Sequence, residues 1–375
     1  MPQRAQRSAL SRLWGQPRVR ATVWQVGTGL AVLAALLWFQ GNLATNLARR
    51  SLDLGFDFLW GPASFELGDN PVGYAAGDSF LLAFAAGLGN TLQVAAIGIA
   101  LTACTGVAMA LLRLSHNPLT AGAAKLYVEI ARNTPLLLQL MFWHQLIVRV
   151  LPGPRLAWNP LPGVFLSNRG LIVPVLGWQP ALGWALAALA LGIVLAVMAR
   201  RRIAWLLPVL LPLGALAFAQ PMAFDVPVLR GFNFAGGTTL SPEMVALVWA
   251  LVFYQGAFAA ETIRGGILGV PKGLTEAAAS LGLSRAKATR LVVMPLALRI
   301  AIPPLTSQFM SLTKNSSLAV AIGYPDLVRV SNVAISETGR AVECIVITLA
   351  VYLVLSLATA LAMNGWNARL LQRGT

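Results

Sequence analysis

The chain has 375 residues, of which 57% are hydrophobic and only 11% are charged. Soluble domains average roughly 45–50% apolar and about 25% charged residues, so a soluble enzyme of this composition would expose large apolar patches to water. The formal net charge of +15 fits either nucleic-acid binding or basic loops on the cytoplasmic side of a membrane protein. Composition therefore argues against a soluble enzyme, and the positions of the basic residues decide between the two remaining explanations.

Several segments are long and apolar enough to be membrane-spanning helices, which need about 20 residues each. In chain order they are residues 22–39, 88–112, 136–151, 176–198, 203–219, 244–263, 296–322 and 342–363. Prolines open or interrupt the third and the seventh of these segments. The sequence predicts an all-α, polytopic membrane protein with about eight transmembrane helices.

Basic residues gather at alternate ends of the predicted spans. Five arginines precede the first span with no acidic residue among them, and Arg200, Arg201 and Arg202 fill the turn after the fourth. Six further basic residues lie in the loop between the sixth and seventh spans. Because cytoplasmic loops carry the excess of Lys and Arg, both termini are predicted to be cytoplasmic. The positive charge is then mainly a topological signal, and no nucleic-acid partner is expected.

Changes in composition along the chain suggest four parts. Residues 1–21 form a basic tail, residues 22–83 hold the first span and an external loop, residues 84–366 form the main domain, and residues 367–375 form a short tail. Within the main domain, residues 152–241 are rich in Pro and Trp and contain the fourth and fifth spans. This predicts a helical hairpin inserted between older elements.

The loop 268–295, between the sixth and seventh predicted spans, is the most informative segment. Thr275 can cap the N-terminus of a helix, which places Glu276 in the first turn, where the helix dipole favours an acid. Gly282 is placed to end that helix in a left-handed conformation, and Ser284 can cap a second helix. Such short helices are marginal in water by themselves. We therefore expect the loop to dock against a partner.

The spacing within this loop resembles the EAA loop of ABC importer permeases. It reads Glu-Ala-Ala from Glu276, three residues, Gly282, nine residues and Val-Val-Met-Pro, where Pro295 limits the second helix. The family pattern is E-A-A, three residues, G, nine residues and I-x-L-P. The resemblance implies that the first helix is a coupling helix, which sits in a groove of a separate ATPase subunit. The docking residues it assigns are Glu276, Ala277, Ala278, Leu281, Gly282 and Pro295.

Other stretches resemble the permeases for polar amino acids. They are residues 89–94, 129–139, 260–267 and 314–318. The resemblance covers about residues 84–366 outside the insertion, and the long first loop together with the insertion is similar to the general L-amino-acid permease subunits. It implies a type I (MetI-like) importer core with an extra N-terminal span, located in a bacterial inner membrane.

The same resemblance implies a transport subunit that is not itself an enzyme. The sequence lacks the G-x-x-x-x-G-K-[ST] segment that cradles ATP phosphates, so we expect this chain to bind no cofactor or metal, and ATP and Mg²⁺ to be used by a partner. The implied partners are two copies of an ABC ATPase, a second permease subunit (a different one, or the same chain), an external amino-acid-binding protein and the lipid bilayer.

A first group of candidate residues lies before the third predicted span. Glu129 and Arg132 are three residues apart and can pair on one helix face, and Glu261 and Arg264 raise the same possibility in the sixth span. Thr134 is followed by Pro135, which predicts a helix break, because the residue before a proline avoids the helical region. The break can be a hinge for alternating access or a simple span boundary.

A second group lies in or beside the seventh predicted span and consists of Lys314, Asn315, Ser316 and Ser317. Polar residues inside a membrane usually face a cavity, which suggests a substrate pathway. The alternative is a kinked segment whose backbone groups are satisfied by these side chains.

Two other classes of function compete with an ATP-driven importer for L-amino acids. An ion- or proton-coupled secondary transporter would use carboxylates and broken helices near the membrane midplane, whereas no Asp or Glu lies clearly in the middle of a predicted span. A membrane-embedded enzyme would need paired carboxylates, a metal cluster or a nucleophile elbow, and the sequence suggests none of these. The importer subunit is therefore the favoured function.

Overall fold

The computed structural model describes residues 17–49, 55–176 and 224–372. The chain divides into two units, residues 1–58 and 59–375, and each is described by itself. The first contains one long helix, α2 (Pro17–Arg49). Its segment Ala21–Asn42 is long and apolar enough to cross a membrane, and it includes the first predicted span.

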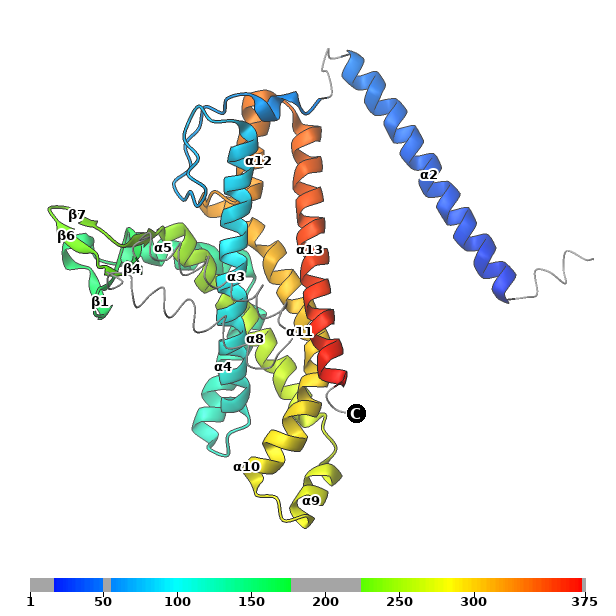
Figure 1. The fold of residues 1–375 in the computed structure, drawn as a ribbon, viewed down its shortest axis with the longest axis vertical. Coiled ribbons are helices and arrows are strands. Elements are labelled where there is room, and N and C mark those ends of the chain that lie inside the picture. The colour runs from blue at the N-terminus through cyan, green and yellow to red at the C-terminus, as the bar shows by residue number, and fades with distance from the viewer. Residues whose placement is uncertain (1–16, 50–54, 177–223, 373–375) are drawn as a thin grey trace, which may run out of the picture. The chain divides into compact units, whose positions relative to one another are not determined.

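The second unit is a bundle of long helices with a small β region beside it (Figure 1). The long helices are α3 (Phe80–Arg113), α8 (Pro242–Leu268), α11 (Met294–Asn315) and α13 (Ala341–Gln372). The shorter helices are α4 (Pro118–Asn133), α5 (Leu136–Val150), α9 (Lys272–Ser280), α10 (Arg285–Ala288) and α12 (Leu327–Thr338). Short 3₁₀ or π turns complete them: η1 (Asp57–Trp60), η2 (Pro154–Leu156), η4 (Thr289–Val293) and η5 (Ser316–Ile322).

Five helical segments of the described residues are long and apolar enough to cross a membrane. They are Ala21–Asn42, Phe80–Arg113, Pro242–Leu268, Arg285–Ile322 and Ala341–Leu361, which correspond to the first, second, sixth, seventh and eighth predicted spans. The third predicted span is the 15-residue helix α5. The fourth and fifth lie, apart from Leu176, outside the described residues. The fold is mostly helical as expected, but the predicted count of eight spans is not confirmed.

Local capping explains where several of these helices begin. The Ser79 hydroxyl accepts a hydrogen bond from the Leu82 amide at the start of α3, and the Asn117 side chain accepts one from Leu119 at the start of α4. Ser241 caps α8 by accepting from the amide of Met244 at 3.1 Å. A side-chain oxygen at this position satisfies an amide that has no partner within the helix.

The close approach of α3 and α8 forms the centre of the bundle. A Cβ atom added to Gly106 of α3 would lie only 2.7 Å from the Cβ of Ala259 of α8, and Ala259 is completely buried. Of an apolar 18-residue stretch of α8, 61% is buried inside the protein, against 6% of the corresponding stretch of α13. Small residues let helix backbones approach closely, and such packing stabilises helix association where apolar burial supplies little driving force in lipid.

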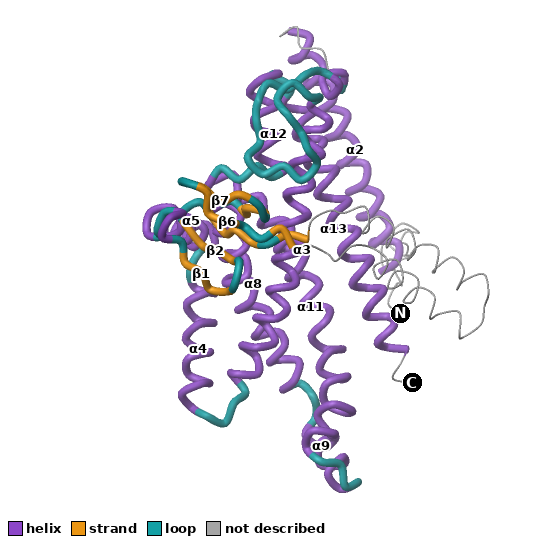
Figure 2. Tube along the Cα trace, turned by 60° about the vertical axis from the view of Figure 1, so that its left-hand side comes forward, coloured by secondary structure: helices purple, strands orange, loops and turns teal. Residues whose placement is uncertain are grey.

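The two ends of the second unit carry different features (Figures 1 and 2). Helices α9 and α10 lie at one end, whereas α12 and the loop before α3 lie at the other. Helices α3 and α8 run toward the α9 end, α11 returns, and α13 runs back. The loop before α3 is fixed to α12 by the Ser64 hydroxyl, which donates to a carboxylate oxygen of Glu337 at 2.7 Å.

Short strands on both sides of residues 177–223 were not predicted from the sequence. A four-stranded antiparallel sheet has the order β1-β2-β3-β8, and two further pairs are β4-β5 and β6-β7. The strands are β1 (Trp158–Leu161), β2 (Val164–Ser167), β3 (Gly170–Val173), β4 (Val175–Leu176), β5 (Phe224–Asp225), β6 (Val228–Arg230), β7 (Asn233–Ala235) and β8 (Thr238–Leu240). Val175 lies opposite Asp225 and Leu176 opposite Phe224, so the described strands β4 and β5 lie side by side.

We predict that Gly106→Ala lowers the free energy of unfolding by about 1–3 kcal/mol, the usual cost of overpacking, because the new methyl group meets Ala259. Thermal unfolding of the purified protein in detergent, followed by tryptophan fluorescence, measures this. The control is Gly122→Ala in α4, where an added Cβ has nothing within 4 Å. Ala259→Gly should restore stability to the Gly106→Ala variant. Equal unfolding temperatures for both alanine variants would contradict the packing argument.

Candidate functional site

The loop between α8 and α11 folds into the two short helices that its sequence predicts. Helix α9 ends in a Schellman motif, in which the Leu283 amide donates to the Ala278 carbonyl at 3.1 Å and the Gly282 amide donates to Ala279 at 2.9 Å. Gly282 has φ +78°, a left-handed conformation that costs glycine little. The Ser284 hydroxyl then accepts from the Lys287 amide at the start of α10. The sharp bend between the helices is thus fixed by backbone hydrogen bonds.

Two details of this loop differ from the sequence prediction. Helix α9 begins at Lys272, after Pro271, and no side chain caps it. Thr275 therefore lies inside the helix, where its hydroxyl donates to the Lys272 carbonyl at 2.6 Å, and Glu276 lies beyond the first turn. Pro271 supplies the start instead, because it fixes an extended backbone immediately before the helix.

Pro295 does not end the second helix as predicted. The chain runs from α10 through the π turn η4 into α11, so residues 285–322 form one helical segment. Pro295 lies in the first turn of α11, where a missing N–H is tolerated. The wider π turn accommodates the change in hydrogen-bond pattern before the proline. Helix α10 is therefore directly continuous with the helical segment that corresponds to the seventh predicted span.

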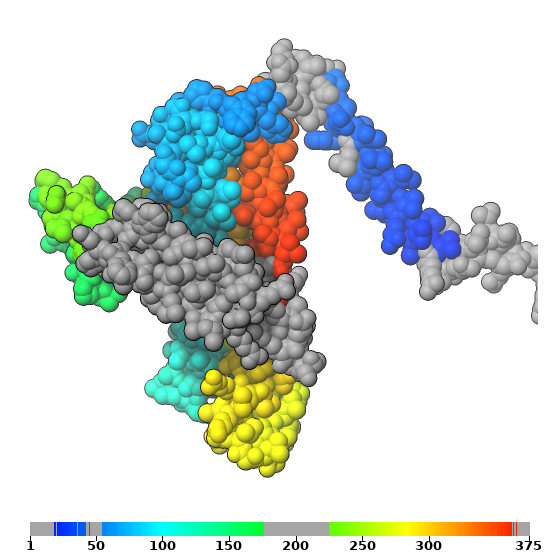
Figure 3. Space-filling model, in the orientation of Figure 1, coloured from blue at the N-terminus to red at the C-terminus, as the bar shows by residue number. Residues whose placement is uncertain are grey.

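The residues assigned to docking are mostly exposed. Leu281 is 81% exposed, whereas Ala278 is 3% exposed because α9 packs against η4 and α10. The others, Glu276, Ala277, Gly282 and Pro295, are all exposed. In the space-filling view this region projects, in yellow, from one end of the second unit (Figure 3).

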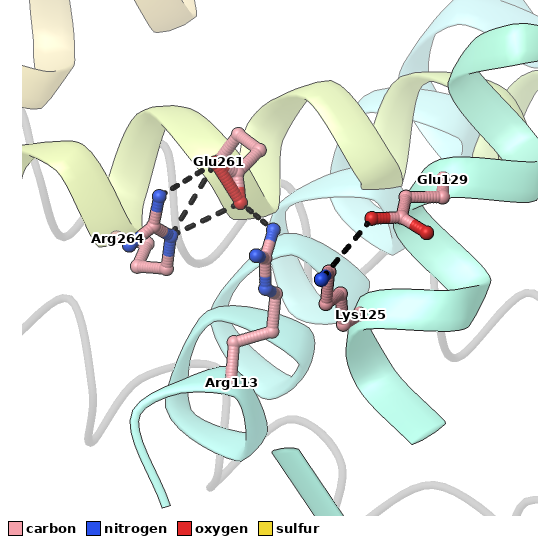
Figure 4. Close-up of polar contacts among 5 residues, drawn as sticks. All are labelled: Arg113, Lys125, Glu129, Glu261 and Arg264. Atoms are coloured by element: carbon pink, nitrogen blue, oxygen red, sulfur yellow. Dashed lines mark hydrogen bonds and ion pairs between the residues drawn. The ribbon is translucent and has the colours of Figure 1, made fainter. Parts of the chain in front are cut away.

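The predicted helix break is present. Helix α4 ends at Asn133, Thr134 has extended backbone angles (φ −100°, ψ 129°), and α5 begins at Leu136. Glu129 and Arg132 do not pair with each other, however. Glu129 lies 3.7 Å from the ammonium of Lys125 one turn earlier, as Figure 4 shows, and Arg132 lies 4.9 Å above the ring of Phe258 on α8. The aromatic face attracts the guanidinium away from the carboxylate.

The pair in α8 is present and has a third member. The guanidinium of Arg264 lies 2.9 Å from the Glu261 carboxylate, and Arg113 at the end of α3 also points at this carboxylate and bonds to it (Figure 4). Sequence reasoning missed Arg113 because it is 148 residues away from Glu261. The one available signal was that both residues lie near the same predicted end of their spans. This cluster connects α3 to α8 at the α9 end of the bundle.

The four polar residues of the seventh span do not form one cluster. Ser316 is completely buried, and its hydroxyl donates to the Thr313 carbonyl at 2.7 Å, while the Ser317 hydroxyl donates to Lys314 at 2.7 Å. Asn315 is half-buried and Lys314 is exposed. The two serine hydroxyls therefore donate to backbone carbonyls where the α-helix changes to the 3₁₀ turn η5. The side chains of Lys314 and Asn315 take no part in these two hydrogen bonds.

A buried polar network at the α12 end was not predicted. The Asn90 side chain donates to the carbonyls of Asp69 and Pro325, each at 2.9 Å, and joins α3 to two loops. Asp326 is completely buried and caps α12 by accepting from the Arg329 amide at 2.8 Å. Burial raises the pKa of Asp326 to about 7, against the ordinary value of 3.8, although backbone hydrogen bonds oppose the shift.

A family described as "Binding-protein-dependent transport system inner membrane component" matches residues 188–373. The chain is 41% identical to the putative amino-acid ABC transporter permease protein YhdX of Escherichia coli, over 95% of both chains. It is 40% identical to the general L-amino acid transport system permease protein AapQ of Rhizobium johnstonii, over 94% of this chain and 93% of that protein.

A third relative is similar over the same extent. The chain is 34% identical to the glutamate/glutamine/aspartate/asparagine transport system permease protein BztB of Rhodobacter capsulatus, over 96% of this chain and 95% of that protein. The resemblance to ABC importer permeases, and within them to the general L-amino-acid permease subunits, is therefore confirmed.

We predict that Asp326→Asn removes a pH dependence of stability. The folded state favours the protonated carboxyl, so the stability it contributes is complete below pH 3.8 and is lost as the pH rises through about 7. Between pH 4.5 and 7.5 the unfolding temperature of the unchanged protein should fall by about 4 °C more than that of the variant. The exposed Glu66→Gln is the control. Parallel curves for all three proteins would refute the assignment.

Proposed function

Because the chain belongs to the family of binding-protein-dependent transport system inner membrane components, we propose that it is the pore-forming permease subunit of an ATP-driven importer of L-amino acids. The family consists of transport subunits of the inner membrane, so the chain is not an enzyme. The observation that carries the proposal is the projecting loop of α9 and α10, in which the exposed Leu281 and the left-handed Gly282 lie at the spacing of an EAA loop. The relatives give no support to an ion-coupled transporter.

In this proposal α9 docks in a groove of the ATPase subunit, and Glu276, Ala277, Ala278, Leu281, Gly282 and Pro295 contribute to the contact. Two ATPase copies bind ATP and Mg²⁺, and this chain binds no cofactor or metal. When the ATPases close, they move α9, which packs against η4. Since η4 leads directly into α11, the movement reaches a membrane span without a flexible connection.

We assign the break between α4 and α5 to a hinge. Glu129, Arg132, Thr134 and Pro135 lie around it. The extended Thr134 and the proline allow a change of angle there with little loss of helical hydrogen bonds. Lys314, Asn315, Ser316 and Ser317 are assigned to the substrate pathway. The geometry favours Lys314 and Asn315 for contact with a substrate, because both serine hydroxyls already donate to backbone carbonyls.

The remaining partners follow from the orientation of the bundle. We place the α9 end in the cytoplasm, with both termini on that side, since the basic residues Lys272, Arg285, Lys287 and Arg290 surround the loop. The α12 end then faces the amino-acid-binding protein. A second permease subunit completes the pore, and we take it to be a different chain, as the resemblance to the general L-amino-acid permease subunits implies.

We predict that Gly282→Asp abolishes ATPase docking. An aspartate at φ +78° is strained, and its charge would lie beside the exposed Leu281. Co-purification of the ATPase with the tagged permease should fall at least tenfold, together with uptake of labelled amino acids in cells. Glu276→Lys should act in the same direction through its reversed charge.

The matched control is Gly339→Asp. Gly339 also ends a helix in a left-handed conformation, with φ +69°, but it follows α12 at the opposite end of the bundle. Its substitution imposes similar backbone strain and should leave ATPase co-purification unchanged. Unchanged co-purification in the Gly282→Asp and Glu276→Lys variants would refute the docking role of the loop.

A further inference from the structure

The break between α4 and α5 leaves the carbonyl groups of residues 131–134, at the end of α4, without their usual helical donors. Pro135 has no N–H, so the carbonyl of Ala131, four residues earlier, loses its usual donor. The carbonyl of Thr134 also loses its donor, because the Leu138 amide donates to Pro135 at 3.1 Å instead. Inside a bilayer no water can replace these donors, so the protein has to supply them.

One side chain replaces two of the missing donors. The Nε2 of Gln139 lies 2.9 Å from the Ala131 oxygen and 2.9 Å from the Thr134 oxygen. A glutamine amide carries two N–H groups, so it can serve both of these carbonyls at once. Gln139 is only 6% exposed, and Leu136 and Leu140 beside it on α5 belong to the apolar core of the bundle. Its polar amide is thus held inside an apolar packing layer by the break itself.

The surroundings leave room for the break to change its angle. A half-open cavity of about 340 Å³ adjoins it, lined by Thr134 and Gln139 together with Ile130, Leu138, Phe142, Trp143 and Phe253. Beneath it, Tyr127 donates to the Phe253 carbonyl at 2.8 Å. Helices α4 and α5 both pack against α8, and the cavity lies beside the break that joins them.

We propose that Gln139 is the positioning residue that holds the α4–α5 break in its bent form, so that the two helix segments keep a defined angle during transport. The inference rests on the proposed transport function and on the hinge assigned to Pro135. It adds a residue outside the predicted set: a side chain that replaces, with one amide, the two donors removed by the proline and by the extended Thr134. An aliphatic side chain of similar size would fill the same space and leave both carbonyls unpaired.

The first test compares Gln139→Leu with Gln145→Leu, a matched substitution at an exposed position of the same helix. Both permeases are reconstituted in liposomes with their ATPase, their partner permease and the binding protein, and uptake is measured against amino-acid concentration. We expect Gln139→Leu to lower the maximal rate at least tenfold with little change in KM, because substrate capture belongs to the binding protein. Gln145→Leu should lower it less than twofold.

Gln139→Met sharpens the test. The methionine side chain keeps the length and flexibility of glutamine but carries no hydrogen-bond donor, so this variant should transport as poorly as Gln139→Leu. Full activity of either Gln139 variant would overturn the proposal. ATPase co-purification should be unchanged in both, whereas its loss accompanies failure of the docking loop, so the two failures can be distinguished.

The second test restores one missing donor by Pro135→Ala, whose new N–H can reach the Ala131 carbonyl. Combined with Gln139→Leu, it should recover at least half of the unfolding temperature that Gln139→Leu loses, but not the uptake, because the bend is removed. Purely additive losses in the double variant would overturn the role of Gln139. Recovery of both stability and uptake would show that transport does not need the bend, which overturns the hinge.

Discussion

The backbone of a membrane-spanning segment has to satisfy its own hydrogen bonds, and the structure of this chain depends on that requirement. Regular helices meet it automatically, but the second unit departs from the regular helix in several places. At Pro135 two carbonyls are taken up by Gln139. At the end of α11, Ser316 and Ser317 donate to carbonyls where the α-helix tightens. Both of these irregularities thus come with polar side chains that bond to backbone carbonyls, as a low-water environment requires.

The same requirement explains how the helices are held to one another. Helices α3 and α8 approach closely enough that Gly106 has no room for a Cβ, and the Glu261 carboxylate joins the two at their common end through Arg113. At the other end, Asn90 connects α3 to the carbonyls of two loops. Close packing along the middle and polar contacts at both ends thus join α3 and α8 into one frame, against which α5 and α11 pack.

Sequence reasoning recovered the features that depend on neighbouring residues. Long apolar segments marked the spans that the structure describes, and Gly282 and Ser284 ended and began helices as expected. Sequence reasoning failed where a residue far away in the sequence competes with a neighbour for the same side chain. Arg132 was expected to pair with Glu129, but it lies over the ring of Phe258, which is remote in sequence.

The buried Asp326 was missed for a related reason. Aspartate is an ordinary N-capping residue, so the sequence gives no sign that this one is buried. Its burial comes from the packing of α3 and two loops around it. The strands beside residues 177–223 were missed because they have two to four residues each, which is too short for a periodic pattern. Pro295 was misread because a π turn, which has no sequence signature of its own, carries the helix past it.

That π turn has a consequence for coupling. A helix that ended at Pro295 would connect the docking loop to the span through a flexible joint, and a push on α9 would be lost in bending it. In the structure α9 packs against η4 itself, so in the proposed function a displaced α9 acts on a continuous helical segment near its start. That segment runs to Ile322, and Pro303 and Pro304 inside α11 interrupt its hydrogen bonds partway along. The segment and the α4–α5 break held by Gln139 then have complementary roles in the proposal, because the first transmits the motion of α9 and the second gives the bundle a place to absorb it.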